Sequence, residues 1–179
     1  EVYGSLEFEG LFDEETNLQP NSPYAASKAA GDLLTRAWYK TYSLPTITTR
    51  CSNNFGPRQH DEKFIPSIIN SLISDKPIKI YGDGQNIRDW IFVVDHVHAL
   101  IEIAFSGKAG EIYNIGSNCE ISNIKMANLV FQNYNALLNI KNSPDNLTNE
   151  HIHFVKDRLG HDFRYAINSS KIKKELNWR

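Results

Sequence analysis

The sequence predicts an α/β protein, because short strand-like runs alternate with amphipathic helical patterns along its 179 residues. A helical pattern from Tyr24 to about Tyr42 leads into the β-branched run Thr46–Cys51. A second helical pattern after Glu62 leads into the strand-like run Ile78–Tyr81. The first run passes directly into the polar segment Ser52–Pro57. Because open α/β sheets bind ligands beyond the carboxyl ends of their strands, this segment is a candidate binding loop.

The sequence predicts one long helix and one buried strand in the first third of the chain. Residues 5–21 are acidic and rich in turn formers, which predicts a loop. Ser22 is the expected N-cap of the helix and Pro23 suits its first position. Pro45 ends the helix, and a loop over 52–57 follows the strand.

The rest of the chain repeats this alternation. Asp95 is expected to cap a helix that reaches about Phe105, and Ser122 or Asn123 should begin another that reaches about Leu138. Residues 139–150 form the most loop-like stretch. The remaining expected elements are strands at 78–81, 90–94, 111–115 and 152–155, an extended piece at 164–167 and a helical pattern from 169.

Composition excludes several classes of partner. The net charge of −2 and the pI of about 6.3 give no overall positive field, so we expect neither nucleic acid nor a membrane as partner. The two cysteines, the lack of a signal peptide and the lack of a long apolar run predict a cytoplasmic protein.

We expect no metal site. His151 and His153 would share one face of a strand, but no Cys or carboxylate converges on them in the sequence. His96 and His98 follow Asp95 at a helix start, where turn geometry explains them better than ligation.

The strongest local signal for chemistry is Tyr24 and Lys28, which lie four residues apart on one helix face. A neighbouring ammonium stabilises a phenolate, so the pair can act as a general base toward a substrate hydroxyl. The alternative is that the two side chains merely share a helix face. Since this spacing is common by chance, the motif by itself favours the alternative.

Further motifs reverse that interpretation, because together they resemble the extended short-chain dehydrogenase/reductase superfamily and, within it, the dTDP-glucose 4,6-dehydratases. The resemblance covers essentially the whole chain in order. It is carried by Glu1-Val2-Tyr3-Gly4, Ser22–Lys28, Asn53–Pro57, Glu62–Pro66, Ile80–Gly84, Ile87–Trp90, Tyr113–Gly116 and Asp157–Asp162.

The resemblance implies the C-terminal part of a Rossmann-type parallel sheet fold plus a smaller α/β substrate-binding lobe. Residues 1–60 would be the remnant of the NAD-binding domain, and 61–179 mainly the nucleotide-sugar lobe, with about 80–105 returning to the first domain. The sequence contains no glycine-rich strand–turn–helix for a pyrophosphate. We therefore expect the chain to be inactive by itself.

The resemblance also implies NAD as cofactor and a nucleoside-diphosphate glucose as substrate, dTDP-glucose ahead of UDP-glucose. Tyr24 would take the proton from the sugar O4 while hydride leaves C4, and Lys28 would also hold the nicotinamide ribose. Glu1 would remove the C5 proton, and an Asp before it, outside this chain, would protonate the departing C6 hydroxyl. Hydride would then return to C6.

The binding residues carried over from the resemblance lie along the whole chain. Asn54, with Tyr24 and Lys28, would lie on the nicotinamide side. The expected substrate contacts are Asn53, Lys63, Phe64, Lys79, Ile80, Tyr81, Arg88, Asn123, Asp157, Arg158, Leu159, Gly160 and His161.

Some positions depart from the family pattern. Phe55 replaces a Tyr, Lys79 stands where Pro is common, and Arg58–Asp61 replace bulkier residues. These departures bear on the identity of the nucleotide and sugar rather than on the reaction. An NAD-dependent C4 epimerase of the same superfamily and a non-catalytic nucleotide-sugar-binding module remain as alternatives. The resemblance also implies that the intact protein is a homodimer, in which the subunits associate through the helix that carries Tyr24 and Lys28.

Overall fold

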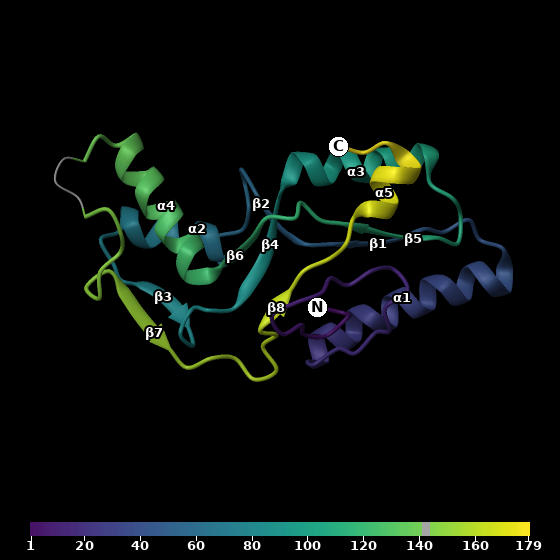
Figure 1. Cartoon of the computed structure of the whole chain (residues 1–179), viewed down its shortest axis with the longest axis horizontal. Helices are drawn as coiled ribbons and strands as arrows, with labels where there is room; N and C mark the ends of the chain where they lie inside the picture. Colours follow the sequence, from purple (N-terminus) through teal and green to yellow (C-terminus); the bar gives the residue numbers. More distant parts are fainter. Residues whose placement is uncertain (141–143) are drawn as a thin grey trace. The chain divides into compact units, whose positions relative to one another are not determined.

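The computed structural model describes residues 1–140 and 144–179 and confirms the α/β class (Figure 1). The chain divides into two compact units: unit 1 contains residues 1–56, 88–120 and 159–179, and unit 2 contains residues 57–87 and 121–158. The elements are α1 (Pro23–Tyr42), β1 (Thr48–Cys51), β2 (Asn53–Phe55), α2 (Phe64–Ile73), β3 (Ile78–Tyr81), β4 (Ile87–Phe92), α3 (Val93–Ser106), β5 (Ile112–Ile115), β6 (Glu120–Ser122), α4 (Asn123–Leu137), β7 (Ile152–Val155), β8 (Arg164–Tyr165) and α5 (Ser170–Leu176).

Unit 1 is built on the parallel pair β1–β5, which is in register from Thr48 opposite Ile112 to Cys51 opposite Ile115. Helix α1 lies on one side of this pair, and α3 with α5 lies on the other (Figure 1). The core on the α3 side consists of Ile91, Ala99, Ile103, Tyr113, Ile115, Ile172 and Trp178. Strand β5 is mostly buried, with Tyr113, Asn114 and Ile115 inside, whereas β1 is only partly buried and ends at the exposed Cys51.

A second core cluster of unit 1 holds the start of the chain against α1. Its buried members are Val2, Tyr3, Phe12, Ala29, Tyr165 and Ile167. The Tyr3 and Phe12 rings stack with their centroids 5.0 Å apart. Isolated bridges from Leu6 to Arg164 and from Phe12 to Ile167 hold the N-terminal segment beside the C-terminal one. The loop predicted over 5–21 is therefore fixed by a packed cluster.

The polar segment after β1 differs from the prediction, because Asn53–Phe55 form strand β2 rather than a loop. This strand runs parallel to β4, with Asn53 opposite Trp90 and Phe55 opposite Phe92. In the same sheet β6 follows β4, and β8 also pairs with β4. The backbone of β4 supplies the ladder partners of β2, and sequence periodicity does not reveal such partners.

The boundary between β4 and α3 was also wrong in the prediction. The strand ends at Phe92 and the helix begins at Val93, so Asp95 lies in the first turn of α3 and is not its cap. Its charge still suits the helix N-terminus. Strand β6 was not predicted, because its three residues are too short to show a period.

Unit 2 consists of the parallel pair β3–β7 packed against α2 and α4. Its buried core is formed by Ile68, Ile78, Ile80 and Ala127. The predicted helices and strands here agree with the structure within a few residues. Within the predicted loop over 139–150, residues 141–143 lie outside the described residues.

The return of the chain to unit 1 covers 88–120, whereas the sequence suggested about 80–105, and residues 159–179 also belong to unit 1. The assignment of the units to cofactor and substrate stays a prediction. Over the described parts of the chain, we find no helix with the length and apolarity needed to cross a bilayer.

Candidate active site

The start of α1 is fixed by a cap and by two buried alanines. The Ser22 hydroxyl accepts a hydrogen bond of 3.1 Å from the Ala25 backbone N–H, as the sequence predicted. Ala25 and Ala29 are 1% and 5% exposed, so the inner face of the first two turns is packed. Because Ala25 and Ala29 face the core, Tyr24 lies on the outer side of the helix, where it is 63% exposed.

Tyr24 and Lys28 lie together on the exposed side of α1. The Lys28 Nζ atom is 5.6 Å from the centroid of the Tyr24 ring, which is within cation–π range. Both side chains are exposed on a helix whose opposite face is packed. The pair is therefore open to a ligand and held on a rigid element.

The segment that begins with Glu1 packs against the same cluster as α1. Glu1 is exposed, but Tyr3 is 2% exposed and belongs to the cluster that includes Ala29 of α1. The Tyr3 hydroxyl donates to Asn114 Oδ1 over 2.8 Å and accepts from Arg50 Nη1 over 2.7 Å. The predicted carboxylate and the predicted base thus extend from segments that share one core.

Strand β2 places Asn53 and Asn54 differently. Asn53 is exposed, whereas Asn54 is half-buried. Asn54 Nδ2 donates to the Ser52 carbonyl over 3.2 Å, and Asn54 Oδ1 lies 2.8 Å from His96 Nδ1. No sequence pattern connects His96 with Asn54, because the contact depends on the pairing of β2 with β4.

Arg88 is buried, although the resemblance assigned it to a phosphate. Its side chain is 5% exposed, and its guanidinium donates to the carbonyls of Asp162 over 2.8 Å and of Phe163 over 3.3 Å. These bonds hold the backbone after the 157–161 segment. The phosphate contact of Arg88 stays a prediction.

Residues 159–161 lie in unit 1 and approach the start of α1. Gly160 has φ +66°, and a Cβ there would lie 2.5 Å from the Asn21 carbonyl oxygen, so the position requires glycine. The Asn21 side chain donates to Asp162 Oδ1 over 2.8 Å. Leu159 is 92% exposed, and His161 is half-buried. The structure thus brings this segment to the helix that carries Tyr24.

In unit 2, β3 places the three predicted nucleobase contacts on alternate faces. Ile80 is fully buried in the core, so its side chain does not line a surface, while Lys79 and Tyr81 are exposed. The Arg158 guanidinium carbon lies 5.3 Å from the Tyr81 ring centroid. Asp157 accepts a bond from the Arg158 backbone N–H over 2.8 Å. Tyr81 and Arg158 therefore form one cluster.

The other predicted contacts of unit 2 lie at helix starts. Lys63 precedes α2 and Phe64 is its first residue. Asn123 is the first residue of α4, and its N–H donates to the Asn86 carbonyl over 3.0 Å. Helix N-termini suit phosphate groups, which agrees with the predicted role of Lys63 and Phe64.

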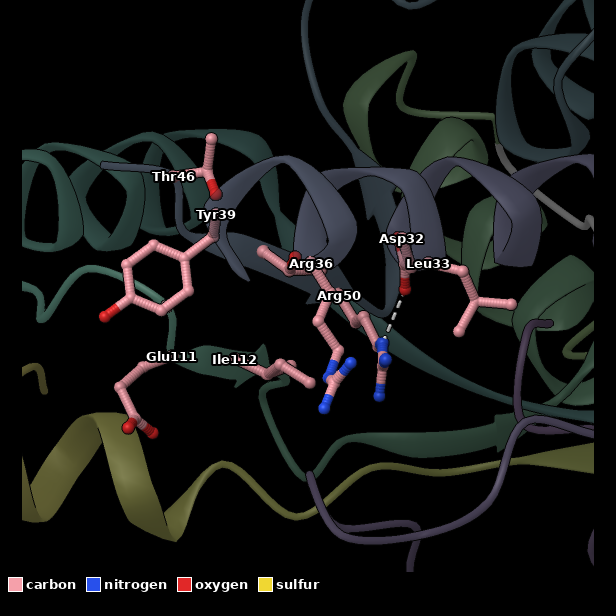
Figure 2. A pocket seen from close by; sticks show the side chains of 10 residues that line it. Asp32, Leu33, Arg36, Tyr39, Thr46, Arg50, Glu111 and Ile112 are labelled. Carbon is pink, nitrogen blue, oxygen red and sulfur yellow. Dashed lines mark hydrogen bonds and ion pairs between the residues drawn. The ribbon is translucent and has the colours of Figure 1, made fainter. Parts of the chain in front are cut away.

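A pocket with a volume of about 100 Å³ lies between α1 and the β1–β5 pair (Figure 2). Asp32, Arg36, Arg50 and Glu111 supply its charged lining, and none of the predicted site residues lines it. Opposite charges balance inside it. In the described ranges 1–140 and 144–179, no three His, Cys, Asp or Glu residues gather as metal ligands would.

Comparison with curated proteins gives the same result as the motifs. The dTDP-glucose 4,6-dehydratase of Haemophilus influenzae is 47% identical over 180 residues, covering 100% of this chain and 53% of that protein. The dTDP-glucose 4,6-dehydratase of Xanthomonas campestris pv. campestris (strain B100) is 49% identical over 181 residues, covering 99% and 50%. The resemblance to these dehydratases is confirmed, and the chain spans about half the length of the curated relatives it matches.

Solved structures confirm the Rossmann-type fold. The dTDP-glucose 4,6-dehydratase of Bacillus anthracis in complex with NAD has a TM-score of 0.87 and 46% identity, covering 99% of this chain and 53% of that one. The Streptomyces venezuelae enzyme with NAD and TYD bound has a TM-score of 0.89 and 40% identity, covering 99% and 52%. A UDP-glucuronic acid 4-epimerase of Bacillus cereus, at 24% identity, TM-score 0.83 and coverages of 99% and 53%, shares the fold.

A family model described as GDP-mannose 4,6 dehydratase matches residues 1–179. The match covers every element described above, including the strand that carries Asn53 and the helix that carries Tyr24 and Lys28. The chain therefore belongs to the GDP-mannose 4,6 dehydratase family.

Proposed function

We propose that the whole protein containing this chain is an NAD-dependent dTDP-glucose 4,6-dehydratase. The observation that carries the proposal is the joint exposure of Tyr24 and Lys28 on the first turns of α1, with the Lys28 ammonium 5.6 Å from the phenol ring. Relatives at 47% and 49% identity bear that enzyme's name. Two similar structures with the same name contain NAD.

The residues of this chain fit the nicotinamide end of NAD. Tyr24 and Lys28 present a hydroxyl and an ammonium from a rigid helix, and the two groups suit a ribose. When bound, NAD+ supplies the hydride acceptor and later the hydride donor of the reaction. Tyr24 and Lys28 are both exposed, so the rest of unit 1 leaves them accessible to a cofactor.

Tyr24 takes the proton from the sugar O4, because a phenolate is a competent base once a cation stabilises it. Lys28 supplies that positive charge from the next turn of the same helix. The buried alanines and the Ser22 cap keep the phenol oxygen in place. A general base held in position accelerates the reaction more than a mobile one, because its orientational entropy is lost before the reaction begins.

Glu1 removes the C5 proton after C4 has been oxidised to the ketone, which makes that proton acidic. Burial of Val2 and Tyr3 anchors the segment next to Glu1, so the Glu1 carboxylate extends from an ordered part of the backbone. An epimerase acting at C4 does not need this elimination step. Glu1 therefore favours the dehydratase over the epimerase.

Unit 2 offers groups that suit the nucleotide. The Tyr81 ring is 42% exposed and can stack on a base, and Arg158 lies against it. A guanidinium binds phosphate oxygens through two parallel hydrogen bonds. We assign dTDP as the nucleotide because the relatives bear that name.

We further propose a cytoplasmic homodimer that associates through α1. Leu34, Trp38 and Tyr42 are 60%, 52% and 68% exposed at helical spacing, and the Trp38 and Tyr42 rings are 5.0 Å apart. An apolar stripe of this kind on one helix is typical of a helix–helix interface. Cys51 and Cys119 are both free, in agreement with a reducing compartment.

The test is turnover by the full-length protein with NAD+ and dTDP-glucose, followed as the 4-keto-6-deoxy sugar. Tyr24→Phe should reduce kcat by about 100-fold or more, since it removes the base. Glu1→Gln should stop product formation while C4 oxidation persists, so that enzyme-bound NADH accumulates. Tyr42→Phe is the matched control on the same helix and should leave kcat unchanged.

Conversion of the sugar at C4 without loss of the C6 hydroxyl would instead identify an epimerase. Binding of dTDP without any turnover would identify a binding module. A tenfold preference for UDP-glucose would correct the nucleotide and leave the reaction class in place.

A further inference from the structure

Strand β2 is too short to be held by its ladder alone. It contains three residues, and it pairs with β4 only from Asn53 opposite Trp90 to Phe55 opposite Phe92. Such a short strand gains few hydrogen bonds for the entropy lost in ordering it. Its side chains must therefore contribute to its position.

The Asn54 side chain makes hydrogen bonds that help to hold β2 in position. Its Nδ2 donates to the Ser52 carbonyl over 3.2 Å and to Cys51 Sγ over 3.4 Å. These two bonds leave Oδ1 directed at His96 Nδ1, 2.8 Å away. Because an amide oxygen only accepts, His96 must carry its proton on Nδ1. Burial lowers the pKa of His96, which favours the neutral ring, and the contact with Asn54 Oδ1 then selects the tautomer with the proton on Nδ1.

The beginning of α3 is packed tightly against the end of β2. A Cβ on Gly56 would lie 2.5 Å from Val93 Cγ1, so only glycine lets the two segments approach this closely. The Phe55 and Phe92 ring centroids are 5.6 Å apart. His96 lies within the first turn of α3 and is held on a rigid element close to the strand.

Successive residues of a strand point to opposite faces, so a bond that fixes Asn54 on one face also fixes Asn53 on the other. Asn53 is exposed, while Asn54 is turned toward α3. We propose that His96 is a positioning residue that, through Asn54, sets the direction in which β2 presents Asn53 to the substrate. This rests on the proposed function and on the predicted contact of Asn53 with the substrate.

His96 does not touch the substrate in this arrangement, and its loss should therefore affect the reacting geometry more than nucleotide affinity. A misplacement of a contact by about 1 Å can cost up to about 100-fold in rate. The nucleotide contacts proposed in unit 2 do not involve β2. A change at His96 should lower kcat and leave the affinity for dTDP in place.

The test uses the full-length protein with three variants. His96→Leu removes the donor, His96→Asn restores an N–H close to the position of Nδ1, and His98→Leu changes an exposed histidine on the same helix as a control. We expect kcat to fall about 10-fold or more in His96→Leu, to recover at least threefold in His96→Asn and to stay constant in His98→Leu. Calorimetry should give the same dTDP affinity for all three.

A double-mutant cycle with Asn54→Ala and an NMR measurement give independent tests. If the pair acts as one unit, His96→Leu should cost little in an Asn54→Ala background. The Nδ1–H resonance of His96 should be protected from exchange in the wild type and lost in Asn54→Ala, whether or not the protein turns over dTDP-glucose. Absence of turnover with a protected resonance would therefore reject the proposed function and retain the contact.

Three results would overturn the inference. The first is an unchanged kcat in His96→Leu. The second is a loss of kcat in His98→Leu equal to that in His96→Leu. The third is loss of dTDP binding together with kcat in His96→Leu, which would mean general damage to the fold.

Discussion

Arg50 on β1 donates from its Nε to Asp32 Oδ2 on α1 over a distance of 2.7 Å (Figure 2). The same guanidinium donates to the Tyr3 hydroxyl and lies 4.7 Å from the Tyr3 ring centroid. Burial raises the pKa of Tyr3, so its hydroxyl stays protonated and donates to Asn114. The chain start near Glu1, the helix of Tyr24 and both strands of the pair thus meet at one arginine.

Asp32→Asn should destabilise the protein by about 2 kcal/mol, because it leaves the buried Arg50 charge without its carboxylate. Arg50 is 8% exposed and Asp32 20% exposed, so solvent replaces little of the lost interaction. Urea denaturation of the full-length protein should show a lower midpoint with an unchanged slope.

Lys108→Gln is the control for this ion pair. Lys108 is 72% exposed and lies 3.7 Å from Glu175, so its loss should cost less than about 1 kcal/mol. Equal midpoints for the two variants would show that burial of the Arg50–Asp32 pair is of no consequence.

Gly160→Ala should lower both stability and activity. The glycine has φ +66°, and an added Cβ would lie 2.5 Å from a backbone oxygen that cannot move aside easily. We expect a loss of about 1–3 kcal/mol and a lower kcat, measured by denaturation and turnover. Gly31→Ala is the matched control: nothing lies within 4 Å of its Cβ, and alanine in a helix should stabilise by up to about 1 kcal/mol. Identical behaviour of the two variants would refute the steric argument.

The pair Glu111–Lys171 should give a small acid-dependent contribution to stability. The Lys171 Nζ bond of 2.7 Å lowers the pKa of Glu111 below its ordinary value of 4.5, and Lys108 and Lys40 act in the same direction. A carboxylate with a lowered folded-state pKa stabilises the fold fully above its unfolded pKa and loses that contribution as pH falls through the lowered value.

The melting temperatures of wild type and Glu111→Gln should therefore differ above pH 4.5 and converge as the pH is lowered below it. The difference should be small, because Glu111 is 45% exposed and solvent screens the pair. A constant difference down to pH 2 would contradict this assignment.

The exposed stripe of α1 should be a subunit interface. Trp38→Glu places a charge in the middle of that stripe, and desolvation of an unpaired charge opposes association. Sedimentation of the full-length variant should show a monomer where the wild type is a dimer. Lys40→Glu, a charge change elsewhere on α1, should remain a dimer; dissociation in both variants would exclude a specific role for the stripe.

Much of unit 1 could be predicted from the sequence because its signals are local. Ser22 and Pro23 mark the start of α1 by their own chemistry, and the structure contains that cap. The β-branched run that contains β1 and the alternation of strands with helices predicted the α/β class. The order of motifs along the chain gave the relationship to the dehydratases.

Other features depend on partners that are distant in the sequence. Asn53–Phe55 form a strand only because β4, more than thirty residues later, offers its backbone. Ile80 was assigned to a surface with its neighbours, but the packing of α2 and α4 buries it. Arg88 was assigned to a phosphate, and its guanidinium bonds to the backbone of 162–163.

The sequence by itself determined which residues can do chemistry, since a phenol, an ammonium and a carboxylate keep their character in any fold. The spacing of Tyr24 and Lys28 also determined that they share a helix face. Only the tertiary structure decided which groups are buried and which are held in place, because His96 meets Asn54 and Arg50 meets Asp32 through contacts between separate elements. Such contacts depend on the packing of whole strands and helices, and no local pattern encodes them.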